Sequence, residues 1–92
     1  MSVLTNEVEP LAASVTVTDD ELTVRLIDGR TISVPLVWFP RLLQANAAQR
    51  GTFELIGDGE GIHWPEIDED ISVAGLLRGV KAPPERKPQP AA

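Results

Sequence analysis

The chemistry available to this chain is limited by a single histidine, His63, and by the absence of cysteine. One histidine cannot build a multi-histidine metal site, and without cysteine there is no thiolate ligand, thiol nucleophile or disulfide. His63 could act as a general base beside a carboxylate because imidazole titrates near neutrality. Alternation, however, places it opposite Ile62 and Trp64, toward solvent or a second layer. We interpret His63 as a surface residue and expect no catalytic residue.

An acidic cluster follows the Trp64-Pro65 pair and consists of Glu66, Asp68, Glu69 and Asp70. Carboxylates bind hard cations, and calcium takes six or more oxygen ligands, but the Asp-x-Asp-x-Asp-Gly spacing of a calcium loop is missing. Acids just before a helix N-terminus also stabilise the helix dipole, which gives the cluster a structural explanation. We therefore expect no metal and no cofactor.

A Gly-x-Gly-x-Gly run at Gly57, Gly59 and Gly61 superficially resembles a phosphate-binding loop. Phosphate loops lead from a strand into a helix, whose N-terminus holds the anion. This run instead joins two strand-like segments. The glycines are therefore explained by turn geometry.

The charge distribution indicates which partners the chain can bind. The formal net charge is −6, and residues 1–77 contain 13 of the 14 acidic side chains but only four of the eight basic ones. Such an acidic body repels phosphates and membrane anions, so we expect no membrane and no nucleic acid as partner of the isolated chain. The acidic surface serves solubility or complements a basic protein.

The spacing of apolar residues predicts two hairpins in the first third of the chain. Val15 and Val17 alternate with polar residues before an Asp19-Asp20 turn, which pairs Val17 with Leu22 and Val15 with Val24. The next turn contains Asp28-Gly29. A two-residue loop would place Ile32 on the wrong face, whereas a three-residue loop over 27–29 pairs Val24 with Ile32 and Leu22 with Val34. We therefore predict the three-residue loop, with Gly29 in the left-handed conformation.

Further along, Pro40 and the spacing of Phe39, Leu42, Leu43 and Ala47 predict an amphipathic helix of about three turns that ends at Gly51. Arg41, Gln44 and Arg50 occupy its polar side. A second hairpin with a two-residue turn at Asp58-Gly59 pairs Leu55 with Ile62 and Phe53 with Trp64. Ser72 is a good N-cap for a last short helix that stops at Gly79.

The predicted architecture is a single α+β domain, a small antiparallel sheet with the element order β-β-β-α-β-β-α. Residues 1–12 form a loose lead-in, residues 13–80 the domain, and residues 81–92 a proline-rich, disordered tail. The edge strands leave room for a homodimer. No segment has the roughly 18 apolar residues of a membrane helix and no signal peptide is visible, so we expect a cytoplasmic protein.

Three segments of the chain also resemble a known bacterial family. They are Leu26-Ile-Asp-Gly-Arg30, Val34-Pro-Leu-Val-Trp-Phe-Pro-Arg-Leu-Leu43 and Gly61-Ile-His-Trp-Pro-Glu-Ile-Asp-Glu-Asp-Ile-Ser72. Together they resemble the domain of unknown function 2442, across about residues 13–80. The resemblance implies a short bacterial protein, often encoded beside a second small protein in a suspected toxin–antitoxin pair. It implies no catalytic residues. Some relatives carry a DNA-binding helix-turn-helix after this domain, and the similarity here does not extend to that segment.

These observations favour a non-enzymatic protein-binding module, the antitoxin-like member of a two-gene pair, with a small and basic protein as partner. Two alternatives stay open, a DNA-associated transcriptional regulator and a carboxylate- or metal-dependent enzyme. Exposed tryptophans are favoured anchors in interfaces, although burial of both tryptophans is the preferred interpretation for so small a core. The predicted partner-binding residues are Trp38, Arg41, His63, Trp64, Glu66, Asp68 and Asp70.

Overall fold

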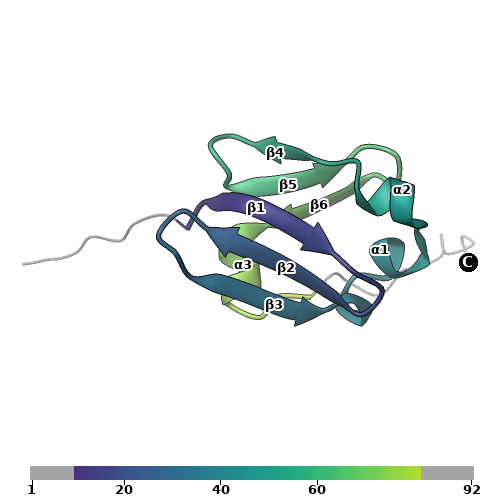
Figure 1. Ribbon diagram of the computed structural model, residues 1–92, viewed down its shortest axis with the longest axis horizontal. Helices are drawn as coiled ribbons and strands as arrows, with labels where there is room; N and C mark the ends of the chain where they lie inside the picture. Colours follow the sequence, from purple (N-terminus) through teal and green to yellow (C-terminus); the bar gives the residue numbers. More distant parts are fainter. Residues whose placement is uncertain (1–9, 82–92) are drawn as a thin grey trace, which may run out of the picture.

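The computed structural model describes residues 10–81 and has an α+β fold built from two three-stranded antiparallel sheets and short helices (Figure 1). Most of the predicted lead-in and tail lies outside the described residues. The elements in chain order are β1 (Ala12–Val17), β2 (Glu21–Leu26), β3 (Thr31–Pro35), the 3-10 helix η1 (Leu36–Trp38), α1 (Pro40–Gln44), α2 (Ala47–Arg50), β4 (Glu54–Ile56), β5 (Gly61–Trp64), β6 (Glu69–Ser72) and α3 (Val73–Leu77).

The first sheet has the strand order β1-β2-β3, and the predicted registers are confirmed. Val17 lies opposite Leu22, and Val24 lies between Val15 and Ile32. Gly29 has a φ of 97°, as the three-residue loop requires. These registers follow from the alternation of side chains along each strand, because a shift of one residue would have turned the apolar side chains out of the core.

The second sheet has the order β4-β5-β6, and the predicted sheet is therefore divided in two. Leu55 pairs with Ile62 as predicted, but the last ladder pair is Ile56 with Gly61, so the turn spans the four residues 57–60 rather than two. Strand β6 was not predicted. Its side chains are alternately buried and exposed, and the pattern is hidden in the sequence because the first buried residue is a glutamate, Glu69.

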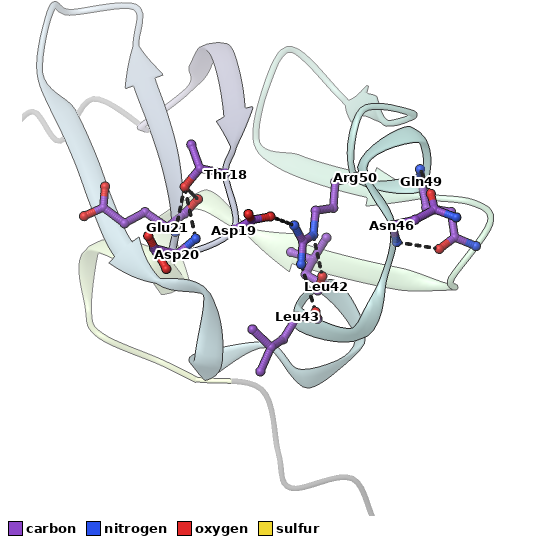
Figure 2. A network of polar contacts seen from close by, with 9 residues as sticks. All are labelled: Thr18, Asp19, Asp20, Glu21, Leu42, Leu43, Asn46, Gln49 and Arg50. Carbon is purple, nitrogen blue, oxygen red and sulfur yellow. Dashed lines mark hydrogen bonds and ion pairs between the residues drawn. The ribbon is translucent and has the colours of Figure 1, made fainter.

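The predicted three-turn helix is interrupted, and this part of the prediction was wrong. Helix α1 ends at Gln44, and α2 begins at Ala47 after Asn46. The Asn46 side chain accepts a hydrogen bond from the Gln49 backbone N–H, and Gln49 Oε1 accepts one from the Asn46 N–H (Figure 2). This reciprocal capping box satisfies two backbone donors at once, so asparagine starts a new helix here instead of continuing the old one.

Helix α3 has the predicted ends. Ser72 Oγ accepts a hydrogen bond from the Gly75 N–H at 3.1 Å, which is an N-cap. At the other end, Gly79 has a φ of 78°, its N–H donates to Leu76, and the Val80 N–H donates to Gly75. These two bonds form a Schellman motif, in which a glycine is preferred because of its positive φ.

The buried side chains of both sheets and of the helices form one apolar cluster. Trp64 is fully buried within it, whereas Trp38 is only half-buried, so the preferred expectation that both tryptophans are buried was wrong for Trp38. The β4–β5 turn is fastened to β1 at Gly59, whose carbonyl accepts the Ala12 N–H at 2.8 Å. A Cβ at Gly59 would lie 2.6 Å from the Ala12 carbonyl oxygen, so only glycine permits this approach.

Candidate protein-binding surface

The turn between β5 and β6 carries two of the predicted binding residues, Glu66 and Asp68, and α1 holds it in place. Asp68 has a φ of 55°, a left-handed conformation that aspartate tolerates better than most residues. Its carbonyl oxygen accepts a hydrogen bond from Arg41 Nη1 at 2.5 Å. The structure therefore brings together Arg41 and Asp68, which are 27 residues apart in sequence. This contact fixes the turn against α1 through backbone, so the Asp68 carboxylate is not used in it.

His63 and Asp70 are also brought together, on the face of the second sheet that points away from the core. They are direct neighbours in the β5–β6 ladder, and His63 Nδ1 lies 2.5 Å from Asp70 Oδ1. The other neighbour of His63 is Glu54 on β4. His63 thus lies in the ladder between Asp70 and Glu54, with its side chain half-buried.

The carboxylates in the turn and on the outer face of β6 are displayed to solvent. Glu66, Asp68 and Asp70 are all exposed, whereas Glu69, on the opposite face of β6, is almost fully buried. Within residues 10–81 no group of three or more histidine, aspartate or glutamate side chains is arranged to hold a metal ion. The exposed carboxylates together form an acidic surface, which we call the acidic hairpin (Glu66, Asp68 and Asp70).

The two tryptophans have different roles. Trp64 Nε1 donates a hydrogen bond to the Arg50 carbonyl at 3.0 Å, and its ring centroid lies 6.0 Å from that of Phe53. Trp64 is thus a core residue that a partner cannot reach in the folded domain. It is therefore not part of the candidate surface. Trp38 stays partly accessible, with the Lys81 ammonium 5.2 Å from the centroid of its ring, a cation–π contact.

A shallow hollow of about 180 Å³ lies along β6 and reaches Lys81. Its walls include the four residues of β6 together with Phe39, Gly75, Val80 and Lys81. No sequence pattern indicated this hollow, because it depends on a strand that was not predicted and on the path of the chain after α3.

Arg50 was placed on the polar side of a helix, but the structure buries it. Its guanidinium donates to the carbonyls of Leu42 and Leu43, at 2.9 and 2.8 Å, and to Asp19 Oδ1 at 2.8 Å (Figure 2). The same side chain therefore caps the end of α1 and contacts the β1–β2 turn. Arg50 supports the fold behind the candidate surface and is not part of it.

Comparison with known proteins agrees with this architecture. Residues 12–82 match the family described as "Protein of unknown function (DUF2442)". The chain belongs to the DUF2442 family. Among solved structures, this DUF2442 chain is similar to a protein of unknown function from Rhodospirillum rubrum, with 31% sequence identity and a TM-score of 0.70 over 83% of this chain and 94% of the other.

A second solved structure supports the fold alone. It is an uncharacterized protein from Chromobacterium violaceum, with 21% identity and a TM-score of 0.67 over 80% of this DUF2442 chain and 70% of the other. No curated protein matches the chain. No helix among residues 10–81 is long and apolar enough to cross a membrane.

Proposed function

We propose that this DUF2442 protein is a non-enzymatic, cytoplasmic protein-binding module that recognises a small basic protein, as the antitoxin-like member of a two-gene pair. The observation that carries the proposal is the acidic hairpin. The carboxylates of Glu66 and Asp68 in the β5–β6 turn and of Asp70 on β6 are exposed, and Arg41 ties the backbone of that turn to α1.

The electrostatic consequence is steering of a basic partner. Like charges gathered on one surface create a field that accelerates the encounter with an oppositely charged protein, and salt screens it over about 8–10 Å. Because Arg41 holds the turn through the Asp68 carbonyl, this contact leaves the Asp68 carboxylate available to a partner, whereas the Asp70 carboxylate also contacts His63. A pre-ordered turn also loses less conformational entropy on binding than a loose one.

Trp38 supplies the apolar part of the proposed interface. It is the last residue of η1 and is half-buried, and the Lys81 ammonium lies over its ring. Interfaces combine a buried aromatic anchor with a polar rim, and Trp38 with the acidic hairpin offers both kinds of group. Displacement of Lys81 by the partner would expose the ring.

The first experiment is a crosslinked pull-down of the tagged chain from its native cells, read by mass spectrometry. We expect one small basic protein in near-equal amount. Its association with the double variant Glu66→Lys/Asp68→Lys should then be at least about tenfold slower at low salt than with the wild type. The matched control is Asp20→Lys/Asp58→Lys, which changes the net charge equally at exposed positions elsewhere.

Equal association rates for the two double variants would remove the acidic hairpin from the interface. Recovery of no protein partner, together with retention of DNA by the isolated chain at low salt, would favour the alternative of a DNA-associated regulator, because phosphate binding is strongest there.

A further inference from the structure

Strand β6 lies at the edge of the second sheet, and its hydrogen-bonding pattern shows which backbone groups face outward. The Val73 N–H donates to the Glu60 carbonyl at 3.0 Å, in the same register that pairs Ile71 with Ile62 and Glu69 with Trp64. Backbone groups alternate in direction along an antiparallel strand. Residues 69 and 71 therefore bond to β5, while the N–H groups of Asp70 and Ser72 point away from it.

The outward edge offers three backbone groups to a neighbour. These are the N–H and C=O of Asp70 and the N–H of Ser72, because the carbonyl of an N-cap residue such as Ser72 already accepts the first bond of its helix. Within the described part of the chain, no strand pairs with this edge. Such an edge is a ready template for another extended chain.

The hollow along β6 provides the side-chain counterpart of that template. Its volume of about 180 Å³ is bounded by Ile71 on the inner face of β6, by Phe39 and by Val80. On the outer face of the same strand, the Asp70 carboxylate is exposed. The hollow is also lined by the charged residues Glu69, Asp70 and Lys81. A chain that extends the sheet would thus meet the apolar side chains of the hollow together with the negative charge of Asp70.

We propose that the partner binds by adding an extended segment as a fourth strand on the β6 edge, with a basic side chain beside Asp70 and an apolar side chain in the hollow next to Ile71. This inference rests on the proposed function and specifies how the partner is held. Backbone hydrogen bonds would supply affinity and the two side chains specificity, as in other cases of strand addition.

Charge complementarity favours a basic partner over a second copy of this acidic chain. The formal net charge of the chain is −6, and one symmetric pairing of two β6 strands would place Asp70 opposite the same residue of the second copy. Like charges directly opposite one another in a sheet are destabilising. An extended segment with alternating basic and apolar residues has no such conflict.

The test selects random 12-residue peptides displayed on phage against the full chain, with amide hydrogen exchange as the second readout. In the free chain, the amides of Asp70 and Ser72 should exchange quickly, whereas those of Glu69 and Ile71 should be protected by β5. Selected peptides should alternate basic and apolar residues, and on binding they should slow exchange at Asp70 and Ser72 by at least about tenfold.

A matched pair of variants isolates the backbone contact. Ser72→Ala removes the N-cap but keeps the outward N–H, while Ser72→Pro removes both. Proline fits position 72 because its φ is −86°, close to the range that the ring imposes. Peptide binding should survive Ser72→Ala and weaken at least about tenfold in Ser72→Pro, with protection of the β2 amides showing that both variants are folded.

Several results would overturn the inference. They are equal peptide binding by the two Ser72 variants, peptides that protect other amides, or no enriched peptide. Slow exchange of the Asp70 and Ser72 amides in the free chain would also overturn it, because the edge would then already be occupied. If that protection rises with protein concentration, the occupant is a second copy. If it does not, the occupant is another part of the same chain. If binding of a basic partner is weakened by charge reversal in the acidic hairpin but not by Ser72→Pro, strand addition is refuted and the proposed function still stands.

Discussion

Replacing Arg50 with methionine should destabilise the domain by about 3 kcal/mol. Arg50 is 9% exposed and donates to the carbonyls of Leu42 and Leu43 at the end of α1. A hydrogen bond from a charged donor contributes about 1.5–3 kcal/mol, and we take the lower value for each of the two bonds. Methionine keeps most of the aliphatic volume, so the loss reports on the hydrogen bonds rather than on a cavity.

The ion pair of Arg50 with Asp19 should contribute little to this loss. Their charged atoms are 2.8 Å apart, but the Asp19 side chain is 95% exposed. Exposed ion pairs are worth about 0–1 kcal/mol because water and salt screen them. Asp19→Ala should therefore lower the free energy of unfolding by less than about 1 kcal/mol. The loss for Arg50→Lys should lie between those for Asp19→Ala and Arg50→Met, because one ammonium group cannot reproduce the several donors of the guanidinium.

The assay is urea unfolding followed by tryptophan fluorescence, since Trp64 donates a hydrogen bond to the Arg50 carbonyl. With a slope of about 1–3 kcal/mol per M of urea, a loss of 3 kcal/mol lowers the midpoint by about 1–3 M. Arg25→Met, at an exposed arginine on β2, is the control and should change stability by less than about 0.5 kcal/mol. A cost below about 1 kcal/mol for Arg50→Met, or an equal cost for Asp19→Ala, would refute the reasoning.

Three further predictions concern turns, caps and charge. Gly59→Ala should destabilise the domain by about 3 kcal/mol or more in the same unfolding assay, because its φ of 109° is strained for alanine and the new Cβ would clash with Ala12. The control is Gly29→Ala, where the new Cβ has open space, and it should cost only about 1 kcal/mol. Ser72→Ala should lower stability by about 1 kcal/mol by removing the N-cap of α3; no change would show that water replaces the cap. The backbone N–H of Arg30, and then its side chain, hold the pKa of Asp28 below the ordinary 3.8, so stability from this group is present above the unfolded-state pKa and is lost as pH falls through the lower folded-state pKa. An NMR titration should find that Arg30→Ala recovers only part of the shift, because the backbone hydrogen bond remains; full recovery would assign the shift to the guanidinium alone.

The local features of this protein followed from the sequence because each depends on near neighbours in the chain. Alternation of apolar residues, together with the lengths of the turns, determined that Val24 lies opposite both Val15 and Ile32, since a shift of one residue would expose apolar surface. The glycine at position 29 and the serine at position 72 marked a turn and a helix start, because their backbone geometry or side-chain oxygen suits those places. The candidate surface was recognisable only as a group of acidic residues that follows the Trp64-Pro65 pair.

The remaining features were decided by tertiary structure, because they depend on groups far apart in the chain. Arg50 is polar in sequence, yet the ends of α1 and of the β1–β2 hairpin provide acceptors that make its burial favourable. Trp64 and Trp38 have similar sequence contexts, and only the packing of two sheets placed one in the core and left the other beside Lys81. Strand β6 was hidden because its buried positions include a glutamate, and within the described residues the second sheet ends at this strand.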